Sequence, residues 1–286
     1  MPSPREIRTQ IASIKKIQKI THAMQNVAAS KMRRAQQQMA TSMPYATKIC
    51  DVMSHIATSD KEYEHPFLCE HEKTKKIGYI VVSTDRGLCG GLNLNLFKMA
   101  LEHARSFQEQ GVDVEWCLFG RKAEVFFQAL MTNIVAHVSG LGERPQISYL
   151  LGGIKIMLDA YKAEEIDKLF IIHNEFINTL VQKPNISQLL PLIKQQDIPR
   201  YHRGYIYEPA SRALIDTLMS RYIETQVYQA VVDNIACEQV ARMVAMKNAT
   251  DSSKEIIDSL QLTYNKVRQA MITREIAEIV GGADAV

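Results

Sequence analysis

The residues best suited to chemistry in this chain of 286 residues lie in a glycine-rich segment, residues 84–93, with the sequence TDRGLCGGLN. The segment stands between a β-branched run and a helical pattern, a place where backbone N–H groups at a helix N-terminus bind phosphate. Its glycines have the spacing GxxGG, however, which matches neither the dinucleotide fingerprint nor the P-loop, and no Gly-Lys-Ser or Gly-Lys-Thr follows. We therefore expect a tight turn from strand to helix here rather than a nucleotide site.

Other groupings of reactive side chains are weaker. His65 and His71 lie near Glu70 and Glu72 in a proline-containing linker, but their spacing is a poor metal-ligand pattern, and surface histidines are the simpler interpretation. No Ser-His-Asp arrangement and no pair of carboxylates can be traced. The five cysteines are odd in number, widely spaced and without a CxxC, which argues against a disulfide framework or a zinc site and favours a reducing compartment. We expect no catalytic residue, no metal and no cofactor.

The N-terminal segment is strongly basic, although the whole chain has a formal net charge of only +3. Residues 1–48 contain nine Lys or Arg and a single acid, Glu6, for a net charge of +8. A solvated helix face usually mixes both signs. Regularly placed cations suit nucleic-acid phosphates, but the segment has no aromatic residue before Tyr45, and an acidic protein partner fits equally well. Charge alone leaves all three interpretations open.

Two long stretches without glycine or proline predict long helices at the two ends of the chain. Residues 5–43 and residues 210–280 run for 39 and 71 positions in this way. In the first stretch apolar residues recur about every 3.6 positions, close to a coiled-coil seam. A helix as long as the second cannot bury its apolar stripe within one compact domain, so we expect the two to pair as an antiparallel coiled coil. Ala, Ser, Thr and Met replace Leu along much of both seams. We therefore expect the two helices to be held together with only moderate strength.

Between these helices the sequence alternates between strand and helix patterns. Such alternation predicts a parallel sheet with right-handed crossovers, in a Rossmann-like α/β domain. We expect strands at residues 76–84, 112–119, 133–138 and 167–174, helices at 92–110, 121–130 and 148–163, and extended edges at 176–192 and 201–207. The chain then divides into an N-terminal coiled-coil helix at 1–58, a linker at 59–73, the α/β domain at 74–208 and a C-terminal coiled-coil helix at 209–286.

Three motifs, in this order, carry a resemblance to a known family. They are KITHAM and VAASKM within residues 19–32, STDRGLCGGLN at residues 83–93 and ITREIAEIVGGA at residues 272–283. Together they resemble the gamma subunit of the F-type ATP synthase, from one end of the chain to the other. The chain shows neither the cysteine-containing insertion of the chloroplast type nor the transit peptide of the mitochondrial type, so it is similar to the bacterial type.

The resemblance implies a mechanical role. In this family the two terminal helices form an antiparallel coiled coil along the axis of a ring of three alpha and three beta subunits. The α/β domain binds the epsilon subunit and sits on the ring of c subunits. Such a subunit is a rotor shaft without ATP chemistry of its own, and it couples proton-driven rotation of the c ring to ATP synthesis at the beta subunits. The alternatives are a basic coiled-coil nucleic-acid-binding protein and a nucleotide-dependent enzyme built on residues 74–208.

The expected location follows from the same reasoning. No apolar run approaches the roughly 18 residues of a membrane span, and no signal peptide core is visible. We therefore expect a cytoplasmic protein without direct membrane insertion. The resemblance places it peripherally, on the cytoplasmic face of the bacterial plasma membrane, with no nucleic acid among its partners.

The resemblance also implies which residues bind partners. The basic N-terminal face, with a methionine close by, meets acidic loops of beta, and a polar catch near the C-terminal tip transmits torque. A segment near residue 205 touches the c ring, and the glycine-rich loop supplies three residues, of which we expect the cysteine to be accessible. The expected partner-binding residues are Met24, Lys31, Arg33, Arg34, Asp85, Arg86, Cys89, Tyr205, Glu208, Arg268, Gln269 and Thr273.

One stretch of the C-terminal helix is unusually polar. Residues 248–254 read NATDSSK, and Ser252 with Glu255 has the spacing of a capping box, which would start a new helix there. The low helix propensity of Asp and Ser costs up to about 0.7 kcal/mol each, too little to break a helix that partners hold. The resemblance implies a continuous helix.

Overall fold

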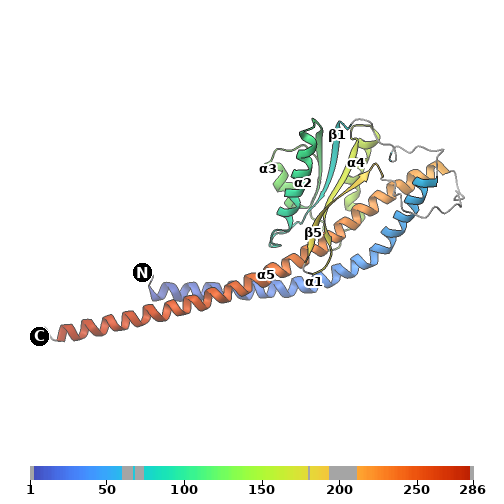
Figure 1. The fold of residues 1–286 in the computed structure, drawn as a ribbon. Helices are drawn as coiled ribbons and strands as arrows, with labels where there is room; N and C mark the ends of the chain where they lie inside the picture. The colour runs from blue at the N-terminus through green and yellow to red at the C-terminus, as the bar shows by residue number, and fades with distance from the viewer. Residues whose placement is uncertain (1–2, 60–66, 68–73, 180, 193–210, 284–286) are drawn as a thin grey trace. The chain divides into compact units, whose positions relative to one another are not determined.

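The computed structural model describes residues 3–59, 67, 74–179, 181–192 and 211–283 of the chain. They fall into two compact units, one made of residues 1–30 with 242–286 and the other of residues 31–241. The long helices α1, Pro4–Ser59, and α5, Ser211–Ala283, contribute to both units, and the sheet belongs to the second (Figure 1). The predicted α/β fold with two long terminal helices is confirmed.

In the first unit the start of α1 runs antiparallel to the end of α5 (Figure 1). A capping box begins α1: the Ser3 N–H donates to a carboxylate oxygen of Glu6 over 3.1 Å, and the Glu6 N–H donates to Ser3 Oγ over 3.3 Å. Ala28 is 1% exposed, so a small residue fills the seam where a leucine would stand in a strong coiled coil. The hydroxyls of Thr21 and Thr250 bond each other over 2.8 Å and add a polar contact between the helices.

The C-terminal end of α5 is exposed in this unit. Among the described side chains of α5 beyond Ile257, none is buried. The large apolar residues of this end are between 44% and 71% exposed, and they are Met271, Ile272, Ile276, Ile279 and Val280. Exposed apolar surface is typical of sites that contact other molecules.

The helix α5 is continuous through residues 248–254, as the resemblance implied. The hydroxyls of Thr250 and Ser253 each donate to the carbonyl oxygen four residues earlier, over 2.8 Å and 2.6 Å. These hydroxyls thus find acceptors within the helix, a geometry that a continuous helix accommodates. The capping-box spacing of Ser252 and Glu255 therefore starts no new helix.

The second unit contains a five-stranded sheet in the order β3-β2-β1-β4-β5. Four strands are parallel, as the alternating pattern predicted, and β5 pairs antiparallel to β4. The strands are β1 Lys76–Val82, β2 Asp113–Phe119, β3 Ile134–Val138, β4 Lys168–Phe176 and β5 Gln182–Leu190, and the helices are α2 Leu92–Gln108, α3 Arg121–Ala129 and α4 Ile147–Lys162. The ends of the predicted elements up to β4 differ from these by at most two residues.

The predicted extended edge at residues 176–192 corresponds to β5. Pro184 pairs with Asn174 there. Proline has no N–H to donate, and an edge strand tolerates this because it has no further neighbour that needs the hydrogen bond. The second predicted edge, at residues 201–207, lies outside the described residues, as does most of the predicted linker at 59–73.

Apolar side chains cover both faces of the sheet. Along β1, Ile80 and Val82 belong to the core shared with α4 and α5, whereas Ile77, Tyr79 and Val81 belong to the core shared with α2 and α3. A central strand buried on both faces is apolar at successive positions, because its side chains alternate between the two faces. The middle of α5 is thus part of the domain core as well as part of a long helix.

Candidate functional site

The glycine-rich loop is a tight turn in which polar side chains form hydrogen bonds within the loop itself. Thr84 Oγ1 donates to the carbonyl oxygen of Arg86 over 2.7 Å, and Asn93 Nδ2 donates to Thr84 Oγ1 over the same distance. Leu88 and Gly90 have positive φ values of 64° and 60°, which the reversal of the chain requires. The prediction of a turn between strand and helix is confirmed.

Asp85 in this loop anchors neighbouring backbone. Its Oδ1 accepts hydrogen bonds from the N–H groups of Arg121 and Gly140, each over 3.1 Å. Because Arg121 begins α3, the carboxylate faces the positive end of that helix dipole. The carboxylate therefore holds three segments together inside this chain.

Cys89 is not accessible, and that part of the sequence prediction is wrong. The residue is 4% exposed and packs with Leu92 and Cys237, while Asn93 Nδ2 donates to its sulfur over 3.4 Å. The positive φ of Leu88 leaves the leucine 60% exposed and turns the next side chain inward. The covering cysteine comes from α5, almost 150 positions away, so no local pattern could have predicted the burial.

The place where an α/β domain usually binds a ligand is occupied by α5. Ligands bind at the carboxyl ends of parallel strands, where the strand order reverses direction, and here that point lies between β1 and β4. At the end of β4, Asn174 Nδ2 donates to Asn234 Oδ1 over 2.9 Å, and the Cys237 thiol donates to the Asn174 carbonyl oxygen over 3.4 Å. All three residues are at most 1% exposed. Side chains of the long helix fill the crevice that an enzyme of this fold would keep open.

A polar chain also joins α1 to α5. Ser42 Oγ donates to Gln229 Oε1 over 2.8 Å, and Gln229 Nε2 donates to Asp233 Oδ1 over 2.8 Å. Burial raises the pKa of Asp233 from 3.8 to about 6, the hydrogen bond from Gln229 opposes this, and the negative charge of Glu175 adds to it. The ionised carboxylate is therefore held at a cost to the folded state.

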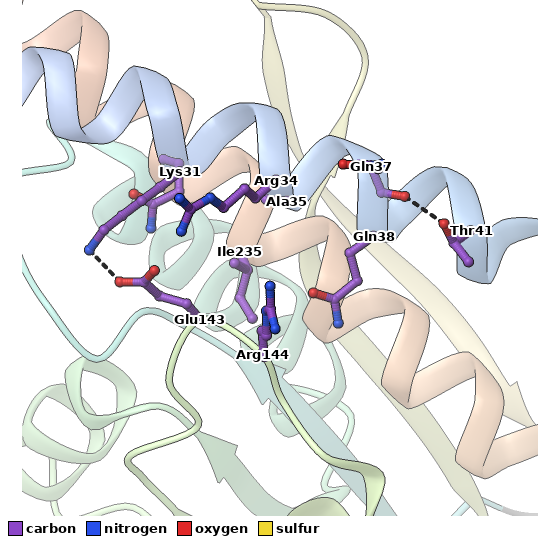
Figure 2. Close-up of a pocket in the computed structure, with 10 residues that line it drawn as sticks. Lys31, Arg34, Ala35, Gln37, Gln38, Thr41, Glu143, Arg144 and Ile235 are labelled. Atoms are coloured by element: carbon purple, nitrogen blue, oxygen red, sulfur yellow. Dashed lines mark hydrogen bonds and ion pairs between the residues drawn. The ribbon is translucent and has the colours of Figure 1, made fainter.

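The second unit contains a cleft of about 620 Å³ between α1, α5 and the loop of residues 139–146 (Figure 2). We call it the cationic cleft, and its main lining residues are Lys31, Arg34, Glu143, Arg144, Ile235 and Gln239. The Lys31 ammonium forms an ion pair with the Glu143 carboxylate (Figure 2). Three cations surround one acid, so the cleft is positive.

The expected partner-binding residues are distributed over both units. In the second unit Lys31 and Arg34 line the cationic cleft, while Arg33 is exposed beside it. In the first unit Met24 is half-buried, and the polar residues near the tip of α5, Arg268, Gln269 and Thr273, are exposed. Tyr205 and Glu208 lie outside the described residues. Arg144 was missed, because its contribution depends on a loop that only folding brings to α1.

Two further searches concern the described residues only. Among their side chains, no three His, Cys, Asp or Glu residues come close enough to hold a metal ion. No helix within the described ranges combines the length and apolar character that crossing a bilayer requires.

The sequence matches the protein family described as ATP synthase over residues 3–286. A relative named ATP synthase gamma chain, from Coxiella burnetii, is 54% identical over 288 residues, which cover 100% of both chains. The fold is similar to chains in two structures of the Euglena gracilis mitochondrial ATP synthase. One, of the rotor, has a TM-score of 0.65 and 18% identity and covers 94% of this chain and 98% of that one. The other, which includes the c-ring, has a TM-score of 0.68 and 19% identity and covers 99% and 94%.

Proposed function

This chain belongs to the family of ATP synthase gamma chains, and we propose that it is the central rotor shaft of an F-type ATP synthase. In this role it couples proton-driven rotation of the membrane c ring to ATP synthesis at the beta subunits. The observation that carries the proposal is the similarity to a gamma chain over the full length of both sequences. The proposed partners are three alpha and three beta subunits, the epsilon subunit and the c ring, at the cytoplasmic face of the inner membrane.

The role is mechanical, and the chain itself is proposed to be non-catalytic. The crevice at the carboxyl ends of β1 and β4 is filled by Asn234 and Cys237 of α5, so a nucleotide has no room at the usual place in this fold. Turning an asymmetric shaft changes its contacts with each beta subunit in sequence. A partner shifts an equilibrium only by binding its two states differently, and contacts that change as the shaft turns meet that requirement at each catalytic site.

The exposed end of α5 suits a bearing inside a ring of partners. Its apolar residues, from Met271 to Val280, offer many shallow contacts, and a shaft must avoid one deep minimum if it is to turn. We assign the polar catch to Arg268, Gln269 and Thr273, which are exposed on the same end. Single exposed ion pairs contribute only about 0.2 to 1 kcal/mol, so torque must be shared over many contacts.

The basic face of α1 is proposed to meet acidic segments of beta rather than nucleic acid. Arg33 and Arg34 are exposed and can reach a partner, and Met24 lies on the same helix. Asp85 and Arg86 of the glycine-rich loop, and Tyr205 with Glu208 toward the c ring, complete the proposed contacts. The chain's family membership favours this assignment over the nucleic-acid alternative.

The test is complementation of a bacterial ATP synthase that lacks its gamma subunit. Inverted membrane vesicles should regain ATP-driven proton pumping when this chain is assembled with alpha, beta and epsilon subunits, and the purified chain alone should hydrolyse no ATP. A chain lacking residues 267–286 is the control, because it removes the bearing and the catch together. Assembly of the full-length chain without any pumping would contradict the proposal.

A further inference from the structure

The cationic cleft draws its charges from separate segments of the second unit. Lys31 and Arg34 stand three positions apart on α1, a spacing that puts both side chains on one face of the helix. Arg144 comes from the loop before α4, and Gln239 comes from α5. Figure 2 shows these segments around a common space, with Lys31 reaching toward Glu143. A solvated helix face does not gather cations from different segments in this way.

The charges of the cleft are only partly balanced within the chain. Glu143 pairs with Lys31, and its side chain is 51% exposed while that of Lys31 is 28% exposed. In the part of the chain that the structure describes, no ion pair is recorded for Arg34 or Arg144. The cleft thus keeps a positive charge excess that an anion from outside can neutralise.

The floor of the cleft differs from its rim. Ala35 and Ile235 line it and are only 6% and 8% exposed, so the cations stand over apolar, weakly polarisable surface. An anion seated there interacts more strongly with the surrounding cations than it would in open water, because the local dielectric is lower.

We propose that the cationic cleft binds a compact diphosphate group, either free as inorganic pyrophosphate or as part of a nucleoside diphosphate. A guanidinium fork matches two phosphate oxygens at once, and two such forks with an ammonium group match a diphosphate. The volume of about 620 Å³ lies in the range of about 300 to 1,000 Å³ that small-molecule sites have. In the free chain the concavity of the cleft and the convergence of its cations suit such a compact anion, whereas the acidic segments of beta proposed above would meet the exposed basic face of α1 in the assembled complex. This binding goes beyond the proposed rotor function and does not rest on it.

Glu143 acts as an internal competitor for the diphosphate. Its carboxylate occupies Lys31 in the ligand-free chain, so an incoming anion must displace it or leave that ammonium group unused. A carboxylate beside a bound phosphate also repels it. Removing the charge with Glu143→Gln therefore frees one cation and removes one anion without changing the shape of the cleft. Tighter binding by this variant cannot arise from misfolding, which makes it the most informative change.

The experiment is calorimetric titration of the purified full-length chain with inorganic pyrophosphate, ADP and orthophosphate. We expect one pyrophosphate per chain, with orthophosphate binding more weakly. Arg34→Gln and Arg144→Gln should each weaken pyrophosphate binding about tenfold, the lower end of what a hydrogen bond to a charged group contributes. Glu143→Gln should strengthen it several-fold. Arg33→Gln is the matched control, because it removes the same charge one position away, outside the cleft lining.

The outcomes separate the possible ligands. Equal affinity for pyrophosphate and ADP identifies the diphosphate alone as the recognised group, and tighter ADP binding adds the nucleoside; both support the site. Absence of pyrophosphate binding overturns the proposal. It is also overturned if Arg33→Gln weakens binding as much as Arg34→Gln, since that is general attraction to a basic surface, or if a polyglutamate peptide binds and pyrophosphate does not displace it.

Discussion

Replacing Asp233 by asparagine should stabilise the isolated chain at neutral pH and leave it almost unchanged in acid. Asparagine keeps the size of the side chain and an oxygen that accepts the 2.8 Å hydrogen bond from Gln229 Nε2. It removes the negative charge that burial and the neighbouring Glu175 disfavour. The substitution therefore measures the free-energy cost of an ionised carboxylate at position 233 in the folded chain.

The magnitude and the sign follow from the pKa. Burial raises the pKa of Asp233 from 3.8 to about 6, and the whole difference corresponds to about 3 kcal/mol. Partial solvent contact of the side chain screens the charge, so we expect about 1 to 3 kcal/mol. Because the folded pKa is the higher one, the cost is absent below pH 3.8, grows as the pH rises from 3.8 to about 6, and is complete above that.

The assay is urea unfolding of the wild-type and Asp233→Asn chains at a series of pH values from acid to neutral, followed by circular dichroism. The stability difference between the two should open as the pH rises from 3.8 to about 6 and reach its full size above that. Asp258→Asn is the control, because it makes the same charge change at an exposed position of the same helix. A difference that stays constant with pH, or an asparagine variant that is less stable at neutral pH, would refute the reasoning.

Three further outcomes follow from other parts of the structure. Gly120→Ala should lower stability by at least about 2 kcal/mol, measured as a lower melting temperature, because Gly120 has a φ of 97° and an added Cβ would overlap the Ser83 carbonyl oxygen. In the folded chain a thiol reagent should modify the half-buried Cys50 before Cys89, which peptide mass spectrometry can follow; faster labelling of Cys89 would contradict its burial. Deleting residues 267–286 should leave the melting temperature of the isolated chain nearly unchanged, since the described side chains there are not buried, but should lower the yield of assembled complex; a large loss of melting temperature would show that this end packs within the chain.

Much of the local structure of this chain could be predicted from its sequence. The long stretches free of glycine and proline indicated α1 and α5, since helix formation depends on short-range backbone geometry and on the period of apolar residues. The alternation of strands and helices likewise indicated the parallel sheet, because each strand is a run of β-branched and apolar residues between clear turns. The turn at residues 84–93 followed from its glycines. The resemblance of three motifs then identified the family, which the spacing of residue types did not identify.

The features that depend on distant segments were decided only by the tertiary structure. Cys89 is buried because Cys237 of α5 covers it, and the ligand crevice is filled because Asn234 reaches the end of β4. The cationic cleft exists because Arg144 and Glu143 reach the basic face of α1 from a loop more than a hundred positions away. Charge, burial and concavity depend on which surfaces meet, whereas periodicity along a sequence reports only which face of an element is apolar.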